Sequence, residues 1–300
     1  MQRVLSSFRD GKGFDLLLVG IPLLFLIALA GLPLVYNVVM SFQEVDMFSL
    51  GQLMRPWVGF KNYAAVFAQP ETWPILRNTV VFVVCSIAGQ FTIGFALALF
   101  FSLKFPGAAY IRGLFLVSWV MPGLVVGAIW NWMLSGDFGI FNFILRSLGL
   151  ITDPIFWRSD TAFSLWSVII ANVWLGIAFN MILLAVGLAA IPRDLYEAAE
   201  LDGATAWQRF WTITLPMMRS TIGAVISLGL IFTLQQFDLF AAITSGGPNN
   251  SSNVAQYWAW QLSFREYDFA RGSTISVMMI VVVMIASVIY VRSTRHEVRG

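Results

Sequence analysis

The chain has 300 residues, of which 58% are hydrophobic and only 11% are charged, with a formal net charge of +2. Its mean hydropathy is +0.78. Because so few charged side chains cannot keep the surface of a chain this size soluble, the composition excludes a soluble protein and predicts an integral membrane protein.

Six apolar stretches of roughly 20 or more residues are each long enough to cross about 30 Å of hydrocarbon as a helix. Backbone in lipid must satisfy its own hydrogen bonds, which favours helices. We therefore expect an all-α membrane protein with six transmembrane helices and both ends on one side. The predicted spans are 15–42, 76–103, 110–134, 161–190, 219–243 and 272–292, preceded by segment 1–14, interrupted by loop 191–216 and followed by tail 293–300.

A cleaved signal peptide is the alternative interpretation of the first span. Arg3, Arg9 and Lys12 precede an apolar run that contains Ala28-Leu29-Ala30, which resembles a signal-peptidase site. Apolar character continues to about Phe42, beyond that site. We expect this helix to be retained.

The third span contains Gly123 and Gly127, four residues apart on one helix face. Glycines at this spacing let a neighbouring backbone approach closely. We expect helix packing at this face, and no chemistry.

Basic residues are concentrated in the segments that six spans would leave on one side of the membrane. The N-terminal segment, the second-to-third connection, loop 191–216 with its exit, and the tail hold eleven of the eighteen Lys and Arg residues. This bias predicts that both termini and the loop face the cytoplasm, although the loop itself is net acidic.

Residues for catalysis are few. Cys85 lies inside the second span and His296 in the tail, and neither residue type occurs elsewhere, so we expect no disulfide and no metal centre built on His or Cys. The sequence has no nucleotide-binding Gly-x-x-x-x-Gly-Lys loop, no Gly-x-Ser-x-Gly turn and no His-Glu-x-x-His pair. We expect no enzyme activity and no cofactor in this chain, and energy from ATP would have to arrive through another subunit.

Loop 191–216 separates the fourth and fifth spans and predicts two short helices. Pro192 ends the fourth span, because its ring excludes it from a helix interior, and opens a helix over about 193–202. That helix carries Leu195, Ala198 and Ala199 on one face. Gly203 can adopt the positive φ that a helix end requires, so we expect a bend there.

A second helix follows the bend. Thr205 and Gln208 fit a capping box, Trp207 shares a face with two further aromatic residues, and Pro216 marks the start of the fifth span. Such a helix pair can lie in the lipid headgroup region. Two basic and four acidic residues make that alternative less favourable than docking into a basic groove of a protein.

The loop resembles a known motif. Glu197-Ala198-Ala199, then Gly203, Ile213 and Leu215-Pro216 occur at the spacing of the EAA motif of permease subunits of binding-protein-dependent ABC importers. Further stretches are similar to the carbohydrate-uptake branch of that family, the maltose and glycerol-3-phosphate type. They are Arg112, Met121-Pro122, Asp137-Phe138-Gly139 with Asn142, and Thr244 to Pro248 with Tyr257 and Phe264.

The resemblance implies that the loop forms coupling helices that dock into a cytoplasmic ATPase. Glu197 would be a polar anchor, Gly203 the bend, and Ala198 with Ala199 the close-packing surface; Asp202, Trp207, Leu215 and Pro216 complete the expected coupling set. The resemblance also implies the partners: a second, related permease, two ABC ATPase subunits that carry ATP and Mg, and an extracytoplasmic solute-binding protein. The implied location is the lipid bilayer of a bacterial or archaeal cytoplasmic membrane, and no nucleic acid is expected.

Polar residues inside the spans are candidates for the solute path, because they are costly there unless they face a wet cavity or another helix. Gln235, Gln236 and Asp238 lie late in the fifth span, with Asp238 about 7 Å from its expected end. A snorkelling Asp238 paired with a nearby Arg is an open alternative. Further candidates are Trp130, Asn131, Asn172 and Asn180. The Asn residues could instead form hydrogen bonds between helices, and Trp130 could belong to an aromatic belt at the membrane interface.

The connection from Ser245 to Arg271 is long and rich in Gly, Asn and aromatic residues. In an importer of this kind it would contact the solute-loaded receptor through Gly246, Gly247, Pro248 and Tyr257; the alternative is an ordered plug that closes the outer mouth. The connection 43–75 has no room for a large inserted domain.

Two other functions are alternatives for this sequence, a secondary transporter and a membrane enzyme. A secondary transporter would use ion-coupling carboxylates near the membrane midplane and inverted repeats. Apart from the peripheral Asp238, the spans carry no acidic residue away from their ends, and no repeat is evident. A membrane enzyme would need a convergent set of acid, base or metal ligands, which the sequence does not offer.

Overall fold

The computed structural model describes residues 12–52, 55–103 and 105–297. Apart from an isolated bridge between Gln43 and Trp57, the regular structure of these residues is helical, which confirms the all-α class. The helices are α2 (Lys12–Leu26), η1 (Ile27–Gly31), α3 (Leu32–Ser41), α4 (Lys61–Ala68), α5 (Thr72–Ser102), α6 (Ala108–Val120), α7 (Gly123–Met133), α8 (Ile140–Ser147), α9 (Ser164–Ala189), α10 (Arg193–Leu201), α11 (Ala206–Arg209), η2 (Phe210–Thr214), α12 (Leu215–Met217), α13 (Arg219–Leu234), α14 (Asp238–Ile243), α15 (Ala255–Trp260), η3 (Gln261–Arg265) and α16 (Phe269–Glu297).

Among the described residues, four unbroken helical segments are long and apolar enough to cross a membrane. They are Leu17–Ser41, Thr72–Ser102, Ser164–Ala189 and Phe269–Val288. Two further pairs of helices pass the same test but are bent: Ala108–Val120 with Gly123–Met133, and Ala206–Met217 with Arg219–Leu234. The number of spans is six when each bent pair counts as one, although the second pair begins within the predicted loop 191–216 and ends before the predicted end at 243.

The predicted third span, 110–134, is not one straight helix. α6 and α7 meet at an angle of 99° across Met121-Pro122. Pro122 has no amide hydrogen to continue the helix, and its ring disfavours the helical conformation at the residue before it. Met121 accordingly adopts extended angles, with φ −69° and ψ 138°.

The predicted fifth span, 219–243, is also interrupted. α13 ends at Leu234, and α14 is a separate short helix that begins at Asp238. α14 packs against α7, where a Cβ on Gly127 would stand 2.5 Å from Cβ of Ala242. The packing role expected for Gly123 and Gly127 is therefore confirmed, and their partner is α14.

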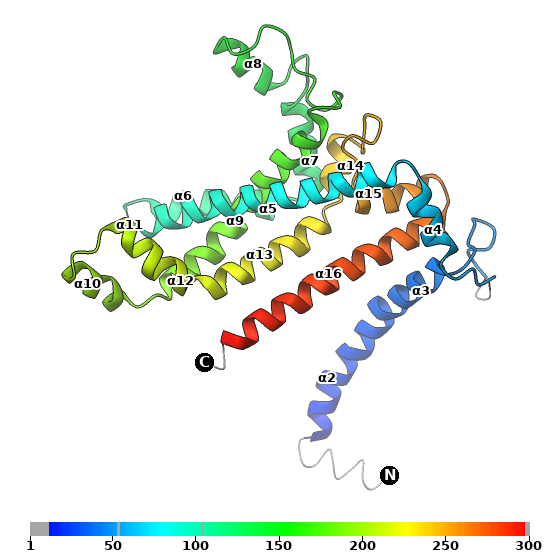
Figure 1. Cartoon of the computed structure of the whole chain (residues 1–300), viewed down its shortest axis with the longest axis horizontal. Coiled ribbons are helices and arrows are strands. Elements are labelled where there is room, and N and C mark those ends of the chain that lie inside the picture. Colours follow the sequence, from blue (N-terminus) through cyan, green and yellow to red (C-terminus); the bar gives the residue numbers. More distant parts are fainter. Residues whose placement is uncertain (1–11, 53–54, 104, 298–300) are drawn as a thin grey trace. The chain divides into compact units, whose positions relative to one another are not determined.

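The chain divides into two compact units, Met1–Val66 with Gln261–Val277, and Phe67–Trp260 with Met278–Gly300. In the second unit, α5 and α9 pack along one another and α13 contacts both (Figure 1). Gly94 makes this contact possible, because a Cβ there would lie 2.6 Å from Cβ of Asn180 and 3.1 Å from the amide nitrogen of Met181. Any larger side chain at Gly94 would push the two helices apart.

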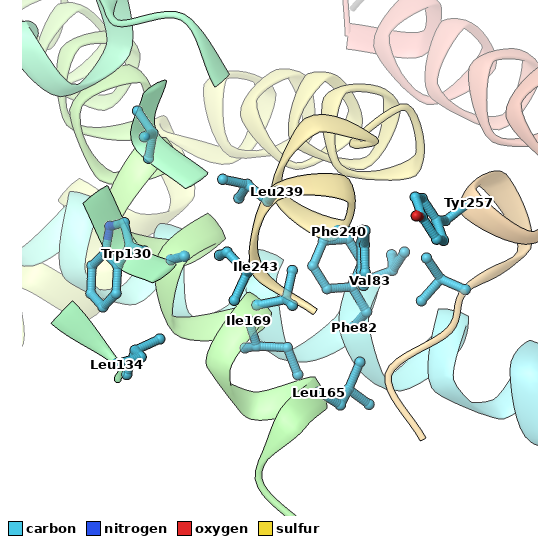
Figure 2. Packing of buried hydrophobic residues seen from close by; sticks show 14 of the residues in the cluster. Phe82, Val83, Trp130, Leu134, Leu165, Ile169, Leu239, Phe240, Ile243 and Tyr257 are labelled. Atoms are coloured by element: carbon cyan, nitrogen blue, oxygen red, sulfur yellow. The ribbon is translucent and has the colours of Figure 1, made fainter. Parts of the chain in front are cut away.

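Two apolar clusters hold the second unit together. Around the first half of α5, Phe82 packs edge-on against Phe240 of α14 with ring centroids 4.8 Å apart, and Ile169 and Tyr257 belong to the same cluster (Figure 2). The other cluster joins the last turns of α5 and α9 to the residues around loop 191–216, including Ile191 and Met218. The loop is thus anchored to the ends of the long helices.

In the first unit, the helical run Leu17–Ser41 has no buried residue in its most apolar window. A helix that is apolar and exposed on all sides requires lipid or another subunit around it. Its turn Ile27–Gly31 is a π-helix that ends two residues before Pro33, whose missing amide hydrogen disrupts the regular pairing with the preceding turn.

Candidate coupling loop and solute cavity

The EAA loop (residues 191–216) has the local structure that its sequence predicts. α10 begins directly after Pro192 and ends before Gly203, whose φ is +76°. The side chain of Thr205 then accepts a hydrogen bond from the amide of Gln208, and the Gln208 side chain accepts one from the amide of Thr205 at 2.7 Å. The predicted helix, bend, helix arrangement is confirmed.

Two side-chain contacts tie the halves of the EAA loop together. Arg209 forms an ion pair with Glu200 across the bend. Tyr196 of α10 shares a hydrogen bond of 2.9 Å with the hydroxyl of Thr214 in η2. These contacts, with the capping box, make the loop one body rather than two independent helices.

The expected coupling residues lie at the surface of the loop. Glu197, Ala198, Asp202, Gly203 and Pro216 are exposed, and Ala199 and Leu215 are half-buried. Large apolar side chains are also uncovered, with Leu201 90% exposed and Trp207 69% exposed. An apolar and acidic surface of this kind is suited to docking with a partner.

A cavity of about 220 Å³ lies where α5, α9 and the end of α13 meet. It brings together two predicted residues, Asn172 and Gln236, through a hydrogen bond of 3.3 Å from Nε2 of Gln236 to Oδ1 of Asn172. Gln90 lines it too and donates to the backbone carbonyl of Asn172 at 2.9 Å. Nδ2 of Asn172 is buried and has no hydrogen-bond partner among the described residues.

The described residues that line this Asn172 cavity carry no ionisable side chain. Aromatic rings form one wall, since Phe179 lies 5.7 Å from Trp119 and 5.4 Å from Phe232 between ring centroids. Carboxamides opposite flat apolar rings can hydrogen-bond hydroxyl groups and cover the apolar face of a sugar ring. The lining residues are Gln90, Trp119, Met121, Asn172, Leu175, Gly176, Phe179, Gly229, Phe232, Thr233 and Gln236.

Sequence reasoning missed Gln90 and the aromatic wall. Gln90 is a buried carboxamide in the middle of a 31-residue apolar helix, and a polar group at that depth is a signal by itself. The aromatic wall had no such signal, because Trp119, Phe179 and Phe232 look like ordinary lipid-facing residues until the helices are packed.

Other predicted path residues lie outside the Asn172 cavity. Trp130 is buried in the apolar cluster, with its ring 5.7 Å from that of Phe141. Asn131 donates to the carbonyl of Ala242 at 2.6 Å and accepts from Arg158 at 2.8 Å, so it holds the end of α14. These contacts give both residues a structural role, and their part in the path stays a prediction.

Asn180 and Gln235 also lie away from the cavity lining. Nδ2 of Asn180 donates to the carbonyl of Gly176 one turn earlier at 2.9 Å, whereas Gln235 is exposed. Asp238 starts α14, and its Oδ2 lies 2.5 Å from where a Cβ on Gly123 would stand, at the first residue of α7. No ion pair of Asp238 occurs among the described residues, and a carboxylate at a helix start is favoured by the helix dipole.

The segment 245–254, which we call the Gly-Pro loop, is tied to the long helices. Nδ2 of Asn78 on α5 contacts the carbonyls of Asn250, Ser251 and Asn253 at 3.0, 3.0 and 3.2 Å. The hydroxyl of Thr79 accepts from the amide of Ala255 at 2.9 Å. These contacts show that the loop is ordered, and its role as a plug of the outer mouth stays a prediction.

The four predicted receptor-contact residues differ in accessibility. Tyr257 is 1% exposed and its ring lies 5.4 Å from that of Phe237, so it is a core residue. Gly246 is buried with φ +79°, while Gly247 and Pro248 are half-buried. A direct contact of a partner with Tyr257 is incompatible with this packing.

The family model described as "Binding-protein-dependent transport system inner membrane component" matches residues 90–299. The chain belongs to this family. It is therefore a permease subunit of an ABC importer, an inner membrane component, and ATP hydrolysis belongs to a separate subunit. The alternatives of a secondary transporter or a membrane enzyme are not favoured.

Two curated relatives are similar to the permease over most of its length. The trehalose/maltose transport system permease protein MalF of Thermococcus litoralis is 32% identical over 246 residues, 81% of either chain. The sulfoquinovosyl glycerol transport system permease protein SmoG of Agrobacterium fabrum is 30% identical over 265 residues, 88% of this chain and 85% of that one.

Solved structures share the fold of the permease. A bacterial alginate ABC transporter in complex with an alginate pentasaccharide-bound periplasmic protein matches 97% of this chain and 96% of its own, with a TM-score of 0.81 and 19% identity. The MetNI methionine ABC transporter in an inward-facing conformation matches 76% of this chain and 98% of its own, with a TM-score of 0.54 and 17% identity.

Proposed function

We propose that the permease moves a sugar or sugar-like solute into the cytoplasm by alternating access, through the Asn172 cavity. The observation that carries this proposal is the pair Asn172 and Gln236, bonded to each other beside Gln90 and opposite an aromatic wall. The buried Nδ2 of Asn172 has no partner and would gain one from a solute hydroxyl. Relatives named for trehalose/maltose and for sulfoquinovosyl glycerol support a sugar as the solute class.

The cavity favours an uncharged part of the solute. A sulfonate, phosphate or carboxylate would lose its hydration there without gaining a cationic partner from the lining. The cavity of about 220 Å³ is smaller than the roughly 300–1,000 Å³ of sites that enclose a whole ligand. A second, related permease would supply the opposite wall.

The EAA loop is the proposed attachment to the ATPase, with both termini on the same cytoplasmic side. Glu197 and Asp202 offer acidic contacts, Ala198 and Ala199 permit close approach, and the exposed ring of Trp207 adds apolar area. Because Glu200–Arg209 and Tyr196–Thr214 tie the loop into one body, closure of two ATPases on ATP and Mg would move it without deforming it. Leu215 and Pro216 pass that motion to α13.

On the other side of the membrane, an extracytoplasmic solute-binding protein would deliver the solute. The Gly-Pro loop would act as the plug, with Gly246, Gly247 and Pro248 in its first turn, and the receptor would act on the plug rather than on buried Tyr257.

The test is reconstitution of the permease with its partner subunits in vesicles. Uptake of neutral disaccharides, such as trehalose and maltose, is compared with uptake of sugar phosphates and uronate oligosaccharides, with and without ATP and the ATPase. We expect ATP-dependent uptake of a neutral saccharide. Uptake driven by an ion gradient without the ATPase, or the absence of ATP-dependent uptake of any saccharide, would overturn the proposal.

A further inference from the structure

A second and larger pocket lies at the other end of α5 and α9, against the EAA loop. Its volume is about 850 Å³, and it shares no lining residue with the Asn172 cavity. The walls come from the last turns of α5 and α9, from α6, and from α10 and α11 of the loop. The solute path described above does not use it.

Three arginines line this arginine pocket: Arg112 of α6, Arg193 of α10 and Arg209 of α11. Glu200 is the only carboxylate among the described residues of the lining, and it is paired with Arg209. Arg112 and Arg193 therefore face the pocket without an acidic partner among those residues. The lining is complementary to an anion.

Arg112 is incompletely satisfied where it stands. Its described hydrogen bond is a long one, 3.4 Å from Nη2 to the carbonyl of Phe101, and its guanidinium lies 5.6 Å from the centre of the Phe101 ring. Its Nε is buried and has no hydrogen-bond partner in the part of the chain that the structure describes. Partial burial of a charge is costly unless an opposite charge or acceptor approaches, so a bound anion would stabilise this arrangement.

Several other residues that line the arginine pocket are apolar, and some of them are exposed at the surface. Leu99, Phe100, Leu188 and Ile191 line the pocket beside the arginines. Phe100 is 50% exposed and Leu103 is 73% exposed, so the apolar lining continues onto the surface of a helix that is apolar enough to span a membrane. The pocket thus combines cationic side chains with apolar side chains, some of which are exposed.

We infer that the arginine pocket binds an anionic phospholipid, with its phosphate between Arg112 and Arg193 and its acyl chains along Phe100 and Leu103. Basic pockets between membrane helices suit such headgroups, and guanidinium groups match phosphate oxygens. Free phosphate would leave the apolar walls unused. That this lipid belongs to the cytoplasmic leaflet follows from the proposed orientation of the EAA loop. The existence of the binding site does not depend on that orientation.

The bound lipid would brace the EAA loop. Tyr196, Glu200 and Arg209 belong both to the pocket lining and to the contacts that hold the loop together. A headgroup filling the space between them and α5 would fix the position of the loop.

The experiment is native mass spectrometry of the assembled transporter with phosphatidylglycerol or phosphatidylcholine of identical acyl chains. We expect wild type to retain phosphatidylglycerol preferentially, and Arg112→Gln or Arg193→Gln each to weaken that retention about five-fold. Arg219→Gln is the matched control, because Arg219 is exposed, follows the EAA loop and is not in the lining. If Arg112→Gln does not fold, the exposed Arg193 carries the test alone.

Equal retention of the two lipids, or the same loss in Arg219→Gln, would overturn the inference. Displacement of phosphatidylglycerol by millimolar inorganic phosphate would assign the pocket to a free anion, and retention by the permease pair alone but not by the assembled transporter would assign it to a contact with the ATPase. Either result also overturns it. Retention is measured without nucleotide or sugar, so a failed transport assay leaves this test intact.

Discussion

Gln236 joins two parts of the permease at once. Its Nε2 donates to Oδ1 of Asn172 on α9 at 3.3 Å, and its backbone carbonyl accepts from Nε2 of Gln256 on α15 at 3.2 Å. The second bond is possible because α13 has ended at Leu234, which frees the carbonyls that follow. The Asn172 cavity and the segment after the Gly-Pro loop are therefore connected through one residue.

Replacing Gln236 with Leu should reduce solute uptake by about ten-fold or more, since a hydrogen bond lost in a buried site costs about 1–3 kcal/mol. Uptake into reconstituted vesicles, with basal ATP hydrolysis measured in parallel, tests this. The matched control is Gln235→Leu, because Gln235 is the exposed neighbour outside the cavity lining. Equal losses in both variants would remove Gln236 from the solute path.

Gly203 should be replaceable only by a residue that tolerates a positive φ. Its φ is +76° and no atom lies within 4 Å of the position that a Cβ would occupy, so the backbone angle and not space is the constraint. Asn adopts this region at little cost, whereas a β-branched residue or Pro does not. Gly203→Asn should keep solute-stimulated ATP hydrolysis, and Gly203→Val or Gly203→Pro should abolish it.

Membrane insertion of all three Gly203 variants should remain intact, as judged by yield of the assembled transporter. Full stimulation in Gly203→Pro would contradict the proposed coupling role of the bend. A bulky acidic side chain at the half-buried Ala199 should have the same uncoupling effect.

Gly94→Ala should destabilise the permease by about 1–3 kcal/mol, because the new methyl group meets Asn180 and the backbone of Met181 and overpacks the contact of α5 with α9. The thermal midpoint of unfolding in detergent should fall accordingly. Gly223→Ala on α13 is the control, since nothing lies within 4 Å of its Cβ position and Ala favours a helix. A fall of equal size in the control would contradict the packing argument.

Asn78→Ala should loosen the Gly-Pro loop. Asn78 is 3% exposed and holds three loop carbonyls, so its loss leaves buried acceptors unpaired at a cost of about 1–3 kcal/mol. Hydrogen exchange of residues 250–255 should accelerate by an order of magnitude or more, roughly the factor that such a cost implies. Exchange unchanged from wild type would show that Asn78 does not anchor the loop.

Local features of this chain could be predicted because they depend on neighbouring residues. The capping box of Thr205 and Gln208 and the positive φ of Gly203 are decided within a few residues, and both are present. Unbroken apolar runs such as Thr72–Ser102 follow from the cost of exposing backbone to lipid.

The break at Met121-Pro122 was harder to foresee, because apolar composition continues through it. The break after Leu234 coincides with the polar residues Gln235, Gln236 and Asp238, but polar residues also occur inside unbroken helices such as α9. Proline in a membrane helix is often tolerated when neighbouring groups satisfy the freed backbone. Here the chain turns by 99° instead, and α7 finds a partner in α14 across Gly123 and Gly127.

By itself, the sequence determined the membrane class, the helical spans and the helix pair of the EAA loop, since hydropathy and backbone preferences act over short distances along the chain. Only the tertiary structure decided which polar groups meet: Asn172 with Gln236 and Gln90, but Asn131 with α14 and Asn180 with its own helix. A buried carboxamide must find some partner, and several partners satisfy it equally well. The choice among them is made by how the helices pack.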